Sequence, residues 1–246
     1  MSSISFFLYR RLSQWITCEF GLSRRSKITL KNKFEVASFK DVFCHPFYWQ
    51  LFHYISTPPQ LVVDCGAHCG HFTILADICF RSKFSTLDTQ YILIEPNPYL
   101  IPIIEKDIRD VAMQGNTRII QGILGCEDEA TLWIPTTNYL AASLTPVADA
   151  KPYSIKAANL SKIVGEQTVD LMKIDIEGGE FEFIHQHQEL FKRVNLVFME
   201  LHSATSDKYD QLSDDLAQAG LFLASEPVTA HGQQLVIFQR KNNTDL

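Results

Sequence analysis

Leu61-Val-Val-Asp-Cys-Gly-Ala-His-Cys-Gly-His-Phe-Thr-Ile-Leu-Ala76 is the stretch that decides the fold. It opens with a short apolar run, typical of a buried parallel strand, which Asp64 ends. Gly66 and Gly70 then mark a turn, and the apolar residues after Gly70 recur at helical spacing. Glycines let a ligand approach the backbone, and a helix start offers free N–H groups. This layout therefore predicts a nucleotide-type site.

The spacing of the two glycines narrows the kind of site. Gly-x-x-x-Gly differs from the Gly-x-Gly-x-x-Gly pattern that holds the pyrophosphate of a dinucleotide. Taken alone, a glycine turn before a helix also fits an ordinary tight connection without a ligand. Other parts of the sequence are needed to distinguish a ligand site from a tight connection without a ligand.

Further apolar runs alternate with helical patterns along the chain. We expect strands at 91–94, 117–121, 169–175 and 195–200, and helices at 71–80, 98–111, 181–191 and 209–219. Shorter strand-like pieces lie at 130–134 and 153–156, and a closing antiparallel hairpin is expected from 221–225 and 235–239. Alternating strands and helices predict an α/β fold with a doubly wound, mostly parallel sheet.

The first 56 residues precede this alternation. We expect a helix at 1–22, a hairpin from 27–30 and 34–39, and an aromatic-rich helical cap at 41–56 that covers the sheet or walls a pocket. The helix at 1–22 packs on the domain in one interpretation, and contacts a membrane surface or a partner in the other. Thr57-Pro58-Pro59 breaks the chain, so we divide it into an N-terminal unit, 1–56, and a main domain, 57–246.

The composition is that of an ordinary globular protein, with 246 residues, 46% hydrophobic residues and a formal net charge of −6. The negative balance argues against nucleic-acid binding, which depends on a basic face. No apolar run reaches the ~18 residues of a membrane-spanning helix. The six cysteines are scattered, and the Cys and His residues around 65–71 lack the separated pairs of a zinc site. We therefore expect a cytoplasmic protein with reduced thiols and no metal.

Acidic residues end three of the expected core strands: Asp64, Glu95 and Asp175. In an open α/β sheet, ligands bind beyond the carboxyl ends of the strands, so these acids should face one crevice. A carboxylate after the second strand is placed to accept hydrogen bonds from the hydroxyls of a ribose. Each acid alone also fits a solvated strand end, but three in register with a glycine turn favour a ligand site.

The motifs at the ends of these strands resemble those of the FkbM family of methyltransferases. They are Val62-Val-Asp-Cys-Gly-Ala-His-Cys-Gly70, Ile94-Glu-Pro-Asn-Pro98, Leu171-Met-Lys-Ile-Asp-Ile-Glu-Gly-Gly-Glu180 and Met199-Glu-Leu-His202, with Ala142-Ser-Leu144 in a central insertion. The third motif is the most specific, since Lys-x-Asp-x-Glu-Gly-x-Glu is close to a family signature. The resemblance covers about residues 27–202. It implies a Rossmann-like class I methyltransferase sheet of seven strands, with S-adenosylmethionine as the cofactor.

The resemblance also implies which residues bind the cofactor. Asp64, Gly66, Ala67 and Gly70 would cradle its amino-acid part, Glu95 would bind the ribose hydroxyls, Pro96 and Asn97 would shape the adenosine wall, and Ile123 would lie along the adenine. His68 is placed to touch the cofactor, although the family more often has Asn at this position.

The expected reaction is O-methylation of a hydroxyl on a sugar, glycan or secondary metabolite. An alcohol acceptor needs a base, and Asp175, Glu177 and His202 are the candidates. His202 is the one whose ordinary pKa lies near neutrality. In an alternative, the two acids hold a divalent metal that lowers the pKa of the acceptor. Two rival functions are a nicotinamide-dependent oxidoreductase, against which the missing Gly-x-Gly-x-x-Gly speaks, and a non-catalytic binding protein on the same fold.

Overall fold

Five parallel strands form the centre of the computed structural model: β3 (Leu61–Cys65), β4 (Gln90–Glu95), β5 (Thr117–Gln121), β8 (Leu171–Ile174) and β9 (Leu196–Leu201). The structure describes residues 18–21, 27–125, 128–138, 141–202, 204–230 and 232–241. Antiparallel strands β10 (Leu221–Leu223), β11 (Val228–Ala230) and β12 (Gln233–Arg240) extend the sheet beside β9. Seven strands lie in the order β10-β12-β9-β8-β3-β4-β5, and β11 pairs with β12 outside this path. The predicted α/β sheet and its closing hairpin are confirmed.

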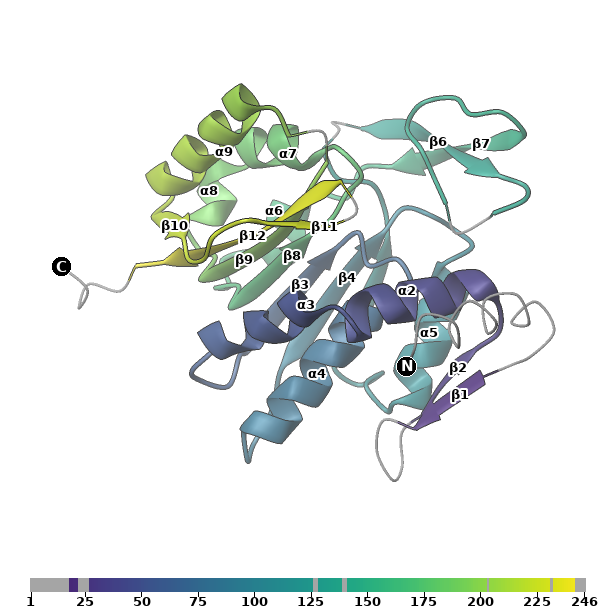
Figure 1. The fold of residues 1–246 in the computed structure, drawn as a ribbon, viewed down its shortest axis with the longest axis horizontal. Coiled ribbons are helices and arrows are strands. Elements are labelled where there is room, and N and C mark those ends of the chain that lie inside the picture. The colour runs from purple at the N-terminus through teal and green to yellow at the C-terminus, as the bar shows by residue number, and fades with distance from the viewer. Residues whose placement is uncertain are drawn as a thin grey trace.

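Helices cover both faces of this sheet (Figure 1). On one face lie α2 (Lys33–Phe43), α3 (Pro46–Leu51), the short 3-10 helix η1 (Phe52–Tyr54), α4 (His71–Lys83) and α5 (Ile101–Asp110). On the other lie α6 (Leu160–Val164), α7 (Glu180–Gln186), α8 (Gln188–Phe191) and α9 (Ser206–Gln218). Successive residues of β3 belong to different apolar clusters, because successive side chains point to opposite faces of the sheet. Val62 lies in the cluster on the first face and Val63 in the cluster on the second.

The N-terminal unit differs from the expectation. Phe34–Phe39 does not form a hairpin strand but belongs to α2, because the side chain of Asn32 accepts hydrogen bonds from the N–H groups of Phe34 and Glu35 and caps a helix. The hairpin is formed instead by β1 (Cys18–Gly21) and β2 (Lys27–Leu30). The predicted helix at 1–22 is therefore wrong at 18–21, and its residues 1–17 lie outside the described part of the chain.

Two helix boundaries also differ from the expectation. The helix after β4 starts at Ile101 rather than beside Asn97, and Pro102 lies in its first turn, where a missing N–H costs no hydrogen bond. The segment expected as one helix at 181–191 is divided into α7 and α8 at His187. Gly220 has a φ of 84° directly after α9, as expected for a helix C-terminus.

The central insertion forms a separate two-stranded sheet of β6 (Glu129–Pro135) and β7 (Ala150–Lys156). It projects from the main sheet at the end where the parallel strands terminate (Figure 1). Within the described residues, no helix has both the length and the apolar character needed to cross a membrane.

Candidate active site

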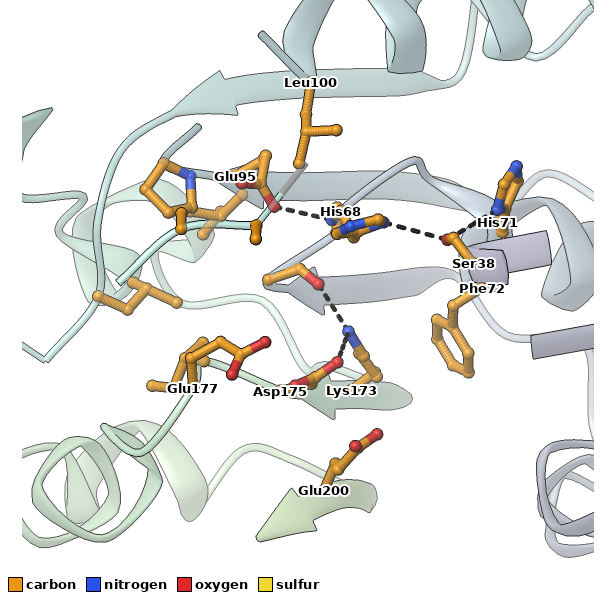
Figure 2. A pocket seen from close by; sticks show the side chains of 18 of the residues that line it. Ser38, His68, His71, Phe72, Glu95, Leu100, Lys173, Asp175, Glu177 and Glu200 are labelled. Carbon is orange, nitrogen blue, oxygen red and sulfur yellow. Dashed lines mark hydrogen bonds and ion pairs between the residues drawn. The ribbon is translucent and has the colours of Figure 1, made fainter. Parts of the chain in front are cut away.

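A cavity of about 570 Å³ opens at the carboxyl ends of β3, β4, β8 and β9. Its walls come from the turn after β3, from α2, and from residues 141–144 of the insertion. Figure 2 shows His68 and Glu95 on one side of this cavity and Asp175 and Glu177 on the opposite side, with Glu200 near Asp175. Two of the three acids predicted to face one crevice, Glu95 and Asp175, thus line this cavity, whereas Asp64 is fully buried behind it.

The turn after β3 is held closely against its neighbours. Gly66 and Ala67 both donate N–H bonds to the carbonyl of Ile94, at 2.9 and 3.0 Å. Gly66 has a φ of 75°, and a Cβ at this position would lie 1.7 Å from the backbone oxygen of Asp175. Gly70, also with a φ of 75°, begins α4. The turn therefore requires glycine at position 66 and brings main-chain atoms to the cavity.

Glu95 ends β4 and is oriented by backbone donors from two segments. The N–H of His68 donates to Oε2 at 2.7 Å, and the N–H of Asn97 donates to Oε1 at 2.9 Å. Burial raises the pKa of Glu95 to about 7, although both donors act in the opposite direction. Each carboxylate oxygen keeps a further lone pair. The side chain is therefore positioned to accept hydrogen bonds from two neighbouring hydroxyls, as a ribose offers.

Lys173 is buried between carboxylates at the base of the cavity. Its Nζ donates to the carbonyl of Gly66 at 2.6 Å, and lies 3.2 Å from Asp175 Oδ2 and 3.5 Å from Asp64 Oδ1. Asp64 is fully buried and accepts a hydrogen bond from the hydroxyl of Thr73 at 2.7 Å. Burial opposes the charge of Lys173, but Asp175 and Asp64 outweigh it and raise the pKa of the ammonium. The charged Lys173 thus ties the glycine turn to β8.

Most residues predicted to bind the cofactor lie on the cavity wall: Gly66, Ala67, His68, Glu95, Pro96 and Ile123. Asp64, Gly70 and Asn97 are not lining residues. They lie behind the wall instead. Asp64 pairs with Lys173, Gly70 begins α4, and the N–H of Asn97 donates a hydrogen bond to Glu95. Contact of each with the cofactor stays a prediction.

His68 is tied to the N-terminal helix α2. Its Nδ1 lies 3.1 Å from Ser38 Oγ, which lies 2.9 Å from Nδ1 of His71. Burial lowers the pKa of His71 to about 3, so this ring is neutral. Ser38 therefore accommodates the histidine at position 68 and joins α2 to the glycine turn. No local pattern in the sequence marks Ser38, because its contact with His68 spans 30 residues.

Glu177 and His202 lie at the end of the cavity next to β9. Glu177 lines the cavity with a side chain that is 74% exposed, whereas His202 is not a lining residue. Nδ1 of His202 lies 3.0 Å from Glu180 Oε1, and Nε2 lies 3.5 Å from Glu177 Oε2. Burial opposes charge on His202, but the hydrogen bond to Glu180 and the nearby carboxylates raise its pKa to about 9. The ring is therefore an imidazolium at neutral pH, and its role as a base stays a prediction.

Glu200 is a cavity residue that the sequence analysis missed. It lies in β9, and its Oε2 accepts a hydrogen bond from the hydroxyl of Tyr48 at 3.4 Å. Burial and the charge of Asp175 raise the pKa of Glu200 to about 7, while Lys173 and His202 oppose this rise. A usable signal was present, because Glu200 follows the apolar run of its strand as Glu95 follows that of β4.

Asp175, Glu200 and His202 each present one atom of a kind that binds metals, and these atoms lie within 4.8 Å of one another. This set differs from the two acids, Asp175 and Glu177, of the metal alternative. Lys173 Nζ lies 3.2 Å from Asp175, and the imidazolium of His202 supplies a second positive charge. Two cationic side chains thus lie beside this set of metal-binding atoms.

Comparison with known proteins places this site in context. A family model described as the methyltransferase FkbM domain matches residues 64–220, which include the whole sequence from Asp64 to His202. No curated protein matches the chain. Similar solved structures include a precorrin-6y C5,15-methyltransferase from Geobacter metallireducens GS-15, with 11% identity, a TM-score of 0.49 and coverage of 80% of this chain and 89% of that one. A methyltransferase from Pyrococcus furiosus has 11% identity, a TM-score of 0.47 and coverage of 84% and 94%.

Proposed function

The chain belongs to the FkbM methyltransferase family, and from this premise we propose that it methylates a hydroxyl group on a small neutral acceptor, such as a sugar, a glycan or a secondary metabolite. The cofactor of the family, S-adenosylmethionine, supplies a methyl group activated on a sulfonium. The residues present fit it, because the oriented carboxylate of Glu95 suits a ribose and the turn at Gly66 and Ala67 lines the cavity.

The observation that carries the proposal is the acidic floor opposite Glu95. Asp175, Glu177 and Glu200 all line this part of the cavity. An alcohol keeps its proton at neutral pH, so its methylation gains from a nearby carboxylate that accepts the proton. Asp175, Glu177 and His202 stay the predicted catalytic group, with Asp175 positioned by Lys173. Of the lining residues, Leu132, Ala142 and Leu144 come from the insertion and are proposed as the acceptor side of the wall.

The charge of the residues that line the cavity indicates which class of acceptor it would bind. The lining residues include the carboxylates of Asp41, Glu95, Asp175, Glu177 and Glu200, whereas Lys173 is the one lysine or arginine among them in the described chain. Lys173 is already shared between Asp64 and Asp175. A phosphate group would meet repulsion here. We therefore propose a neutral small molecule rather than a nucleic acid as the acceptor.

The test is release of S-adenosylhomocysteine from S-adenosylmethionine with panels of hydroxylated sugars, hydroxylated aromatic compounds, amines and RNA. We expect release with a hydroxylated compound, and the product should carry a new O-methyl group by mass spectrometry. Turnover confined to amines or RNA would refute the proposed acceptor. Calorimetric binding of NAD(H) without binding of S-adenosylmethionine would instead favour the oxidoreductase alternative.

Glu95→Ala is expected to weaken binding of S-adenosylmethionine by roughly 10- to 100-fold without unfolding the protein. The variant lacks the carboxylate and so would lose its charge-assisted hydrogen bonds to the ribose, which are worth roughly 1.5–3 kcal/mol. Calorimetry measures the affinity, and circular dichroism checks that the variant is folded. Unchanged affinity in a folded variant would show that Glu95 does not bind the ribose.

Cofactor affinity is expected to increase as the pH rises through about 7. Glu95 has a pKa of about 7 in the free protein, so part of it is protonated at neutral pH. The ionised carboxylate is the better acceptor for ribose hydroxyls, so binding selects it, lowers its pKa and releases a proton. Calorimetry in buffers of different ionisation enthalpy measures this proton release. The dependence should disappear in Glu95→Gln, and its persistence there would assign it to another group.

A further inference from the structure

Glu200 lies near the carboxyl end of β9, next to the carboxyl end of β8. β8 and β9 pair in parallel, with Lys173 opposite Phe198 and Ile174 opposite Met199. The next residues along the two strands, Asp175 and Glu200, therefore lie side by side where the parallel strands meet the cavity. Figure 2 shows both carboxylates at this end of the cavity, across from Glu95. Glu200 thus lies beside Asp175 on the side of the cavity opposite Glu95.

The other acids of the floor are less suited to take a proton. Asp175 is paired with the ammonium of Lys173 at 3.2 Å, so its carboxylate already has a cationic partner. Partial burial and the charge of Asp175 raise the pKa of Glu177 as well, but its side chain is 74% exposed and lies on the solvent side of the cavity. Glu200 is half-buried, and in the described structure the hydrogen bond that reaches its carboxylate comes from Tyr48 at 3.4 Å, a long contact. Its oxygens are therefore free to accept a hydrogen bond from a bound hydroxyl.

The charges around Glu200 support the same role. Asp175 and Glu177 face it with negative charge, Lys173 and His202 face it with positive charge, and Tyr48 presents a neutral hydroxyl from α3. Burial and Asp175 dominate and raise the pKa of Glu200 to about 7. A base with a pKa near the working pH combines a large ionised fraction with a useful proton affinity. Burial raises the pKa of Tyr48 further from neutrality, so Tyr48 stays a donor.

We propose that Glu200 is the general base that accepts the proton of the acceptor hydroxyl, an assignment that rests on the proposed O-methylation. The hydroxyl oxygen forms a bond to the methyl carbon while the bond from that carbon to sulfur breaks, and the bonding pair stays on sulfur. The hydroxyl proton moves to Glu200, which later releases it to solvent. Lys173 positions Asp175 beside Glu200, and the imidazolium of His202 stabilises the carboxylate of Glu200.

The first test compares Glu200→Gln with Glu189→Gln, a matched change on a side chain that is 84% exposed in α8. With the hydroxylated compound that gives the fastest turnover, Glu200→Gln is expected to lower kcat by ~10²–10⁴. The wild type should show an activity that rises through pH ~7, and this limb should be absent in Glu200→Gln. Unchanged kcat in Glu200→Gln would overturn the assignment.

A second test needs no acceptor. Sinefungin is an analogue of S-adenosylmethionine that carries an amine in place of the methyl sulfonium, so its ammonium reports the charge near the transferred methyl. The preference of the protein for sinefungin over S-adenosylhomocysteine should fall about tenfold in Glu200→Gln and stay unchanged in Glu189→Gln. An unchanged preference in Glu200→Gln would overturn the placement of Glu200.

These two tests separate failure of the base from failure of the proposed function. If no hydroxylated compound is methylated but sinefungin discrimination depends on Glu200, the proposed acceptor is wrong and the placement of Glu200 holds. Activity that chelation abolishes and added Mg²⁺ restores would overturn the assignment in favour of a metal held by Asp175, Glu200 and His202.

Discussion

Lys173→Met is expected to lower the free energy of unfolding by about 3–5 kcal/mol, because it leaves a buried carboxylate without its partner. Asp64 is fully buried, and Lys173 Nζ lies 3.5 Å from one of its oxygens. That oxygen, Oδ1, has no other hydrogen-bond partner in the described structure. The variant would also lose the hydrogen bond from Nζ to the carbonyl of Gly66. Urea denaturation followed by circular dichroism measures the effect.

Two comparisons make this result specific. Lys192→Met removes a lysine that is 52% exposed and pairs with Glu189 on the surface, so it should change stability by less than about 1 kcal/mol. Adding Asp64→Asn to Lys173→Met should recover part of the loss, because the uncompensated charge is removed. In Lys173→Met, burial raises the pKa of Asp64 and the lysine no longer opposes this rise, although the hydrogen bond from Thr73 still does, so stability should fall as the pH rises above the ordinary range of aspartate. A loss equal to that of Lys192→Met would refute the buried pairing.

Gly66→Ala is expected to destabilise the protein by roughly 2–5 kcal/mol and to abolish measurable cofactor binding. A side chain at a φ of 75° costs about 1–2 kcal/mol, and insertion of a methyl into a packed region about 1–3 kcal/mol. The added Cβ would lie 1.7 Å from the backbone oxygen of Asp175, so β3 and β8 would have to separate at the cavity. Thermal unfolding and calorimetry with S-adenosylmethionine measure both effects.

Gly232→Ala separates the two causes. Gly232 has a φ of 85°, but a Cβ there would meet no atom within 4 Å. This variant should therefore show the conformational cost alone, about 1–2 kcal/mol, with cofactor binding intact. If Gly66→Ala costs no more than Gly232→Ala, the close approach of the turn to Asp175 does not constrain the protein.

Local patterns in the sequence were sufficient for the core of the fold. Parallel strands that are buried on both faces appear as continuous apolar runs, and Leu61–Val63 is such a run at the start of β3, which is buried at all five positions. Parallel strands have their carboxyl ends on the same side of a sheet, and this rule assigned Asp64, Glu95 and Asp175 to that side. The family resemblance then supplied the cofactor, which spacing alone did not identify.

The features that were missed depend on contacts between distant residues. Phe34–Phe39 looked like a strand because its apolar residues suit a pleated surface, whereas the cap at Asn32 and packing against α4 make it a helix. The contact of Tyr48 with Glu200 spans 152 residues, and no local pattern announces it. Charge was also misjudged at His202, because the ordinary pKa of histidine does not include the buried carboxylate of Glu180.

The position of β12 between β9 and β10 has a consequence for the order of assembly during synthesis. β12 pairs with β9 from Gln234 opposite Leu201 to Gln239 opposite Leu196, yet it follows β9 by more than thirty positions along the chain. On the ribosome, the strands β3, β4, β5 and β8 can pair before β12 emerges. During this time the side of β9 that will pair with β12 is an unpaired strand edge, which can pair with other strands. Because β9 carries Glu200, we expect the cavity wall at Glu200 to form after the wall at Glu95 on β4.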